Sequence, residues 1–308
     1  MSDRPASSAV LVADCRATLG EGPVWVPRDD ALYWLDVKGL RLFRLDAAGA
    51  VTQWPTPFRI GGIAPCRGGG FIAGTEHGLA WVDPITGTFE IFDNPERDRP
   101  GNRFNDAKVD RAGRFWAGSM DDGERAASGA LYRVDANCPL PRITVTRIDD
   151  DYRVTNGPAF SRDGRTMYHT DSALQTIYAF DLDAAGDVAN KRVFAQFEGA
   201  DGYPDGMTVD AEDCLWVAFW DGWCVRRLSP AGETIATIAM PVGRPTSVAF
   251  GGPALDRLYV TSARIDLDDA ALAAQPHAGG LFVLNPGVTG VAEIPFEAEH
   301  PFQGIRHR

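Results

Sequence analysis

A repeated unit of four short β-strand patterns, present six times, constrains the fold of this chain more than any other feature. The units begin at six aligned positions: Glu21 (EGPVWV), Gly61 (GGIAPC), Asn105 (NDAKVD), Asn156 (NGPAFS), Asp205 (DGMTVD) and Thr246 (TSVAFG). Further β-branched or aromatic runs follow in each unit, separated by Gly, Pro, Asn or Asp. Such a pattern is typical of antiparallel strands joined by turns. The units start about 40 to 50 residues apart, which is the spacing of β-propeller blades.

The repeat predicts an all-β fold, a six-bladed β-propeller whose four-stranded antiparallel blades surround a central channel. The run VLVADCRATL, at about residues 9–18, precedes the first full unit, so we expect it to form the outer strand of the last blade and close the ring. No break in composition marks a linker, and we expect residues 1–308 to form a single domain. A β-solenoid is the alternative, but solenoid repeats are shorter. The one helix pattern, DDAALAAQ at 268–275, predicts a short decoration of a connection.

Composition and charge exclude several classes of partner. A net charge of −12 and a pI near 4.9 argue against nucleic acids and anionic membrane surfaces, which attract clustered Lys and Arg. No apolar run approaches the roughly 18 residues of a membrane helix. The N-terminus, MSDRPASSAV, lacks the basic and apolar regions of a secretion signal. Five cysteines without CxxC spacing suit reduced thiols, so we expect a cytoplasmic protein. Propellers of this kind are stable alone, so we expect a monomer.

The first positions of the six units carry the chemistry. In a propeller the inner strand of every blade lies beside the channel, so these positions converge on one axis. All of them except Gly61 bear a side-chain oxygen. A convergent set of carboxylate and amide oxygens without His or Cys favours a hard divalent cation such as Ca²⁺, Mg²⁺ or Mn²⁺. Taken singly, each residue fits a turn or strand cap as well.

Several motifs in fixed order resemble the regucalcin (senescence marker protein) and gluconolactonase family. The motifs are EGPVW, NRFNDAKVDRAGRFWAGSM, TNGPAFSRDG, YPDGMTVDAEDCLWVA and AGGLFVL, and they span nearly the whole chain. The resemblance implies a six-bladed propeller and, as in many members, metal-dependent hydrolysis of sugar lactones. It implies Glu21, Asn156 and Asp205 as metal ligands. It implies Arg103 and Asn105, in NRFND, as substrate-binding residues.

The loop after GSM departs from the family pattern. Many members carry a polar or acidic residue there at the mouth of the pocket, whereas this chain reads DDGERAASGALY. Asp121, Asp122 and Glu124 are the candidates, and we assign Asp122 to substrate binding. The alternative for each of the three is a solvated acidic loop.

The expected activity is that of a carboxylic ester hydrolase, a sugar-1,4- or 1,5-lactonase that depends on one divalent metal ion (Ca, Zn, Mn, Mg or Fe(II)). Three protein ligands leave positions open for the lactone and for water. Asp205 is the candidate general base as well as a ligand. Arg103 would donate to ring hydroxyls or to the oxyanion, and the Asn105 amide could both donate to and accept from a hydroxyl. A surface salt bridge and a strand cap are their structural alternatives. Asp106 is assigned a structural role.

Three functions from different classes fit these residues. The first is hydrolysis of a glucono-, xylono-, arabinono-, galactono- or rhamnonolactone to the aldonic acid in sugar catabolism. The second is a non-enzymatic, calcium-binding or regulatory propeller of the regucalcin type. The third is an interaction platform, which the oxygens at the axis disfavour. Arg103 beside Asn105 favours the lactonase over the calcium-binding propeller.

Other catalytic patterns are absent from the sequence. It contains no G-x-S-x-G nucleophile elbow and no HExxH, and its five histidines are scattered. His169 alternates with Tyr168 in a strand pattern and is interpreted as a core residue. Trp220 and Trp223, in FWDGW, are interpreted as hairpin packing, with a sugar contact as the alternative.

Overall fold

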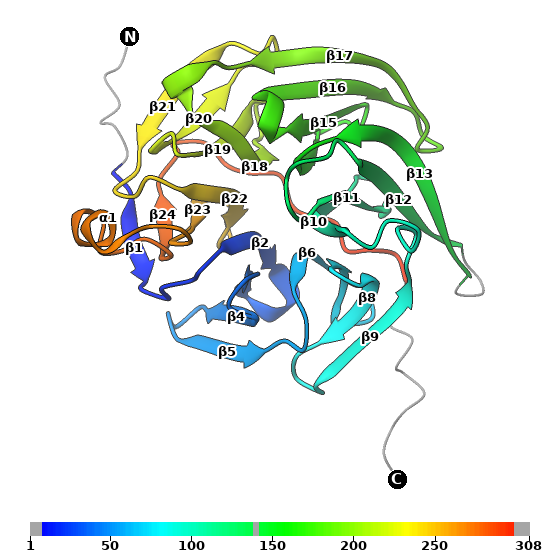
Figure 1. Cartoon of the computed structure of the whole chain (residues 1–308), viewed down its shortest axis with the longest axis horizontal. Helices are drawn as coiled ribbons and strands as arrows, with labels where there is room; N and C mark the ends of the chain where they lie inside the picture. The colour runs from blue at the N-terminus through cyan, green and yellow to red at the C-terminus, as the bar shows by residue number, and fades with distance from the viewer. Residues whose placement is uncertain (1–7, 138–141, 299–308) are drawn as a thin grey trace.

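The computed structural model describes residues 8–137 and 142–298. Its strands form six four-stranded sheets arranged as blades around one axis (Figure 1). Neighbouring strands within each blade pair antiparallel, for example β2 with β3 and β3 with β4. The predicted six-bladed β-propeller is therefore confirmed.

Each blade runs from an inner strand beside the axis to an outer strand at the rim. The inner strands are β2 (Gly20–Val26), β6 (Ile60–Pro65), β10 (Asn102–Val109), β14 (Thr155–Phe160), β18 (Tyr203–Val209) and β22 (Pro245–Gly251). The second strands are β3 (Ala31–Asp36), β7 (Phe71–Thr75), β11 (Phe115–Asp121), β15 (Thr166–Asp171), β19 (Leu215–Trp220) and β23 (Arg257–Ser262). The third strands are β4 (Arg41–Asp46), β8 (Gly78–Asp83), β12 (Gly129–Asn137), β16 (Thr176–Leu182), β20 (Cys224–Leu228) and β24 (Leu281–Leu284). The outer strands are β5 (Val51–Pro55), β9 (Thr88–Asp93), β13 (Arg142–Tyr152), β17 (Val188–Gln196), β21 (Thr234–Ala239) and β1 (Val10–Ala13).

The N-terminal strand completes the sixth blade. β1 pairs antiparallel with β24, so the outer strand of this blade comes from the opposite end of the chain. It is shorter than the run of 9–18 from which it was expected, because β24 offers only the four residues Leu281–Leu284 for pairing. After Ala13 the chain turns toward the first blade.

Apolar side chains hold successive blades together. Between the first two blades, for example, Leu35 of β3 lies in one buried cluster with Ile63 of β6 and Phe71 of β7. The inner strands β6, β14 and β22 are buried along their whole length, whereas β5 and β21 at the rim are mostly exposed. Short helical turns, η1 (Pro27–Asp29), η2 (Ser172–Leu174) and η3 (Gly199–Asp201), and the helix α1 (Asp269–Ala274) occupy connections. No helix among the described residues is both long and apolar enough to span a membrane.

Every inner strand has an irregularity near its start. The pairing register shifts between Glu21 and Val24 in β2, between Asn156 and Ala159 in β14, and after Pro204 in β18, and the other three inner strands show equivalent shifts. A β-bulge bends the strand and changes the direction of the side chains around it. The bulges therefore lie at the positions that the repeat aligned.

A C-terminal segment, residues 285–298, crosses the axis at the other end of the inner strands. Gly290 pairs with Asp210, which follows β18, and Phe296 pairs with Cys66, which follows β6. Lys108 of β10 donates to the Glu293 carboxylate at 3.4 Å. In Figure 1 this red segment passes behind the inner strands. The starts of the inner strands are not covered by it.

Candidate metal and substrate site

The starts of the inner strands surround a cavity of about 710 Å³. All six predicted site residues line it: Glu21, Arg103, Asn105, Asp122, Asn156 and Asp205. The other lining residues are Leu19, Lys38, Met120, Gly123, Glu124, Arg153, Val154, Ser172, Ala173, Tyr203, Trp220, Arg244, Ile265 and Asp266. The repeat alignment and the family resemblance thus indicated residues that the fold brings together.

Two aligned positions do not contribute side chains to this cavity. Thr246 is fully buried, and its hydroxyl contacts the Gly20 carbonyl and Thr261, so it joins the sixth blade to the first. Gly61 is a site of close approach, because a Cβ there would lie 2.1 Å from the backbone oxygen of Asn105. We therefore assign both residues to the packing of neighbouring blades against each other and not to the ligand set.

Glu21, Asn156 and Asp205 are almost completely buried, with 8%, 3% and 6% of their surfaces exposed. Within residues 8–137 and 142–298, neither carboxylate forms an ion pair; Glu21 accepts one hydrogen bond, from the Gly22 N–H at 3.2 Å. Burial and nearby carboxylates raise the pKa of both acids: Asp106 beside Glu21, and Glu21 and Asp106 beside Asp205. Buried negative charges without a cationic partner are costly.

These residues fit a divalent cation. Two carboxylates and an amide offer oxygen ligands, which Ca²⁺, Mg²⁺ and Mn²⁺ prefer. A cation between Glu21 and Asp205 would relieve the repulsion that raises their pKa values. In the described part of the chain there is no group of three or more His, Cys, Asp or Glu side chains placed to hold a metal, so the Asn156 amide is needed to complete this set.

Arg103 is 6% exposed and is held on two sides. Its Nε donates to Asp122 at 2.8 Å, and its Nη1 donates to the Asn105 side-chain oxygen at 2.6 Å and to the Phe104 carbonyl at 3.1 Å. Burial lowers the pKa of Arg103, while Asp122 opposes that shift. Of the three guanidinium nitrogens, Nη2 has no partner among the residues that the structure describes, and it remains available to a ligand.

The Asn105 amide has fewer hydrogen-bonding groups free for a substrate than an asparagine can offer. Its amide nitrogen donates to the Thr155 carbonyl at 2.8 Å and to the Asn156 oxygen at 3.0 Å, which uses both of its N–H groups. Its oxygen accepts from Arg103 and retains a second lone pair. We expected Asn105 to donate to and accept from a substrate, and this geometry leaves only the acceptor.

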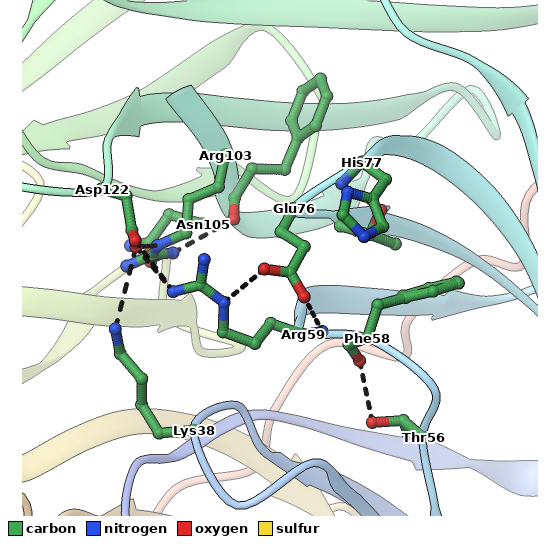
Figure 2. Close-up of polar contacts among 11 residues, drawn as sticks. Lys38, Thr56, Phe58, Arg59, Glu76, His77, Arg103, Asn105 and Asp122 are labelled. Atoms are coloured by element: carbon green, nitrogen blue, oxygen red, sulfur yellow. Dashed lines mark hydrogen bonds and ion pairs between the residues drawn. The ribbon is translucent and has the colours of Figure 1, made fainter. Parts of the chain in front are cut away.

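Asp122 lies at the centre of a group of basic residues (Figure 2). Nη1 of Arg59 approaches its two oxygens at 2.8 and 3.0 Å, and the Lys38 ammonium lies 3.8 Å away. Arg59 in turn donates through Nε to Glu76 at 2.7 Å. The arginine and lysine neighbours hold the pKa of Asp122 below its usual value, against the effect of burial.

The structure also distinguishes the three acidic loop candidates. Asp122 and Glu124 line the cavity, whereas the Asp121 carboxylate accepts from the Arg125 and Ala126 backbone N–H groups within the loop. Sequence reasoning missed Lys38 and Arg59, because they lie at turns and strand starts where a basic residue carries no periodic signal.

Three further residues were assigned structural roles from the sequence. Asp106 accepts hydrogen bonds from the Ala107 and Gly157 N–H groups at 2.8 and 2.9 Å, and burial raises its pKa to about 6. His169 is fully buried, as expected for a core residue, but neither ring nitrogen has a hydrogen-bond partner within the described part of the chain; burial lowers its pKa to about 3. Trp220 lines the cavity beneath Arg244, whose guanidinium lies 4.8 Å from the ring centre.

Comparison with known proteins gives one consistent family. The family model described as SMP-30/Gluconolactonase/LRE-like region matches residues 19–264, which include all six predicted site residues. The chain is 39% identical to the L-arabinolactonase of Azospirillum brasilense, with 95% of this chain and 96% of that protein covered. It is 37% identical to the 6-deoxy-6-sulfogluconolactonase of Pseudomonas putida, with 91% and 95% covered. The crystal structure of the calcium-binding protein regucalcin from Agrobacterium tumefaciens superposes with a TM-score of 0.88 at 31% identity, with 95% and 97% covered.

Proposed function

We propose that this chain, which belongs to the SMP-30/gluconolactonase/LRE-like family, is a metal-dependent sugar lactonase that hydrolyses an aldonolactone to its aldonic acid. One observation carries the proposal. Glu21 and Asp205, two buried carboxylates without an ion pair in the described residues, line the same cavity as Arg103 and Asn105. Relatives named L-arabinolactonase and 6-deoxy-6-sulfogluconolactonase support the reaction class.

Glu21, Asn156 and Asp205 are the residues that would hold the cation. Their oxygen ligands suit Ca²⁺, Mg²⁺ and Mn²⁺, and Zn²⁺ and Fe²⁺ also accept such a set. When bound, a divalent cation would polarise the lactone carbonyl and lower the pKa of a water molecule. The regucalcin neighbour, described as a calcium-binding protein, supports a metal in this family.

We assign substrate binding to Arg103, Asn105 and Asp122. Arg103 has Nη2 available to donate to a ring hydroxyl or to the carbonyl oxygen as charge develops on it. Asn105 can accept from one hydroxyl through its oxygen. Asp122, whose Oδ2 accepts only from Arg59 among the described residues, has capacity for a further hydroxyl. The three residues lie close together (Figure 2), and all three line the cavity.

Hydrolysis requires a base, and Asp205 is the candidate. Water would attack the carbonyl carbon while the Asp205 carboxylate accepts its proton. The bond between the carbonyl carbon and the ring oxygen then breaks, and the ring oxygen becomes a hydroxyl by taking from Asp205 the proton that came from water, which returns Asp205 to its carboxylate form. The product is the open-chain aldonic acid, which ionises at neutral pH.

A calcium-binding propeller without catalysis is the second candidate, because the structural neighbour is a regucalcin described only as calcium-binding. Such a protein needs the oxygen ligands but has no use for a buried arginine whose Nη2 is left for a ligand. Arg103 therefore favours the lactonase.

The experiment that tests the proposal is product analysis on a panel of glucono-, xylono-, arabinono-, galactono- and rhamnonolactones. Each lactone is incubated with the protein in the presence of divalent metal, and the aldonate is quantified by chromatography against the spontaneous rate. Formation of an aldonate well above that rate supports the lactonase and identifies its preferred sugar. Metal binding with no aldonate from any member of the panel would favour the calcium-binding propeller.

A further inference from the structure

A chain of hydrogen bonds runs across the cavity floor from the third blade to the fifth. Arg103 Nη1 donates to the Asn105 oxygen at 2.6 Å, and the Asn105 nitrogen donates to the Asn156 oxygen at 3.0 Å. The Asn156 nitrogen donates to the Ser172 hydroxyl at 2.8 Å, and that hydroxyl donates to the Pro204 carbonyl at 2.6 Å. This series of hydrogen bonds thus includes one proposed metal ligand, Asn156. It ends at Pro204, the residue before a second proposed ligand, Asp205.

The chemistry of the two ends fixes the direction of every bond in this chain. A guanidinium only donates, so Asn105 must turn its oxygen toward Arg103 and its nitrogen toward Asn156. At the other end a backbone carbonyl only accepts, so the Ser172 hydroxyl donates to Pro204 and keeps its lone pairs for the Asn156 nitrogen. Both ends demand the same orientation of the Asn156 amide. Its nitrogen faces Ser172, and its oxygen, which accepts from Asn105, keeps a second lone pair for a cation.

Ser172 is well placed for this task. It is the first residue of η2, directly after β15, and only 7% of its surface is exposed. Its backbone N–H donates to the Val154 carbonyl at 2.9 Å, two residues before Asn156. The backbone of Ser172 is therefore anchored independently of its hydroxyl, and removal of the hydroxyl tests the hydroxyl alone.

We propose that Ser172 is a positioning residue of the metal site, one that holds the Asn156 oxygen toward the cation and ties the fourth blade to the strand that carries Asp205. The inference rests on the proposed metal site but not on its catalytic activity. Without the hydroxyl, the Asn105 N–H is the one partner left among the described residues that fixes the amide, so its nitrogen, which is no ligand, turns more readily toward the cation. Residues that orient metal ligands typically contribute about 10- to 100-fold to metal affinity.

The test is calcium affinity, measured by isothermal titration calorimetry on metal-free protein. Ser172→Ala is expected to weaken calcium binding by about 10- to 100-fold. Ser262→Ala is the matched control: Ser262 is fully buried at the end of β23, its hydroxyl donates to the Gly280 carbonyl at 2.7 Å, and it does not line the cavity. Both variants lose one buried serine hydroxyl, and only the first should lose affinity.

A second experiment, in the Asn156→Asp variant, distinguishes loss of amide positioning from a general disturbance of the structure. In Asn156→Asp both side-chain termini are oxygens, so orientation no longer matters, and Ser172→Ala added to it should change affinity by less than about 3-fold. An equal loss in both backgrounds, or no loss in the wild-type background, would overturn the inference. If Ser172→Ala does not fold, Ser172→Cys, whose thiol is a weak hydrogen-bonding group, serves the same comparison. Absence of calcium binding by the wild-type protein would instead reject the calcium site itself.

Discussion

The carboxylate of Asp122 is held by Arg59, whose Nη1 lies 2.8 and 3.0 Å from its two oxygens, although Arg59 itself does not line the cavity. Asp122 in turn accepts from Nε of Arg103. Arg59, whose Nε donates to Glu76, therefore helps to hold Asp122 and, through it, Arg103 in place. The second blade contributes to the site through this contact.

Loss of Arg59 should impair substrate binding more than the chemical step. In Arg59→Met the Asp122 carboxylate loses a charged hydrogen bond. Asp122 is then less firmly positioned to accept from Arg103. We expect KM to rise by about 10-fold with a smaller change in kcat. Steady-state kinetics on the preferred lactone is the measurement. Arg192→Met, which removes an exposed partner of Asp181 far from the cavity, is the control and should behave as wild type. Equal kinetics for the two variants would show that Arg59 does not hold Asp122 and Arg103 in place for substrate binding.

Asp205 carries two assigned roles, and its removal should abolish hydrolysis while the fold is retained. Asp205→Ala deletes both a metal ligand and the proposed base, so kcat is expected to fall by at least about 10²- to 10⁴-fold. Circular dichroism checks that the β-sheet spectrum is unchanged. Activity near that of the wild type would exclude Asp205 from the mechanism.

The same carboxylate should destabilise the metal-free protein. Burial and the neighbouring Glu21 raise the pKa of Asp205, which means that its ionised form is unfavourable in the folded state. Asp205→Asn removes that charge with little change in shape. At pH 7.5 and without metal, we expect a higher melting temperature than for the wild type and no further rise on addition of calcium. A lower melting temperature would show that the ionised carboxylate stabilises the fold.

Asp106 provides a test of pH dependence. Its folded pKa is raised to about 6, above the ordinary value of 3.8. Well below pH 3.8 it is protonated in both folded and unfolded chains, and as the pH rises toward 6 the unfolded chain ionises more readily, so stability is lost. The difference between the two pKa values corresponds to about 3 kcal/mol. In urea titrations without metal, the stability advantage of Asp106→Asn over the wild type should grow between pH 4 and 7. A constant difference would mean that Asp106 has an ordinary pKa.

Much of this architecture could be predicted from the sequence because the signals are local and repeated. Each blade carries its own alternating strands and turns, and six copies in register define the ring. The same repeat places Glu21, Asn156 and Asp205 at equivalent points of their inner strands, so their meeting follows from symmetry.

The rest depended on the direction of individual side chains, which a repeat does not encode. Thr246 is aligned with the ligands, yet its hydroxyl turns to the Gly20 carbonyl. Asp121 ends β11 and Asp122 follows it directly, but of the two only Asp122 lines the cavity. Arg59 reaches Asp122 from the neighbouring blade, a contact between residues 63 positions apart in the chain. Such contacts become visible only when the blades are placed side by side.

The measurement that tests the central claim most directly is a pH-stat trace on protein freed of metal by a chelator, with L-arabinono-1,4-lactone as substrate. We predict acid release at the spontaneous rate until a divalent cation is added, and then an immediate increase that Asp205→Ala does not show. Hydrolysis that proceeds equally before and after metal removal would contradict a metal-dependent lactonase.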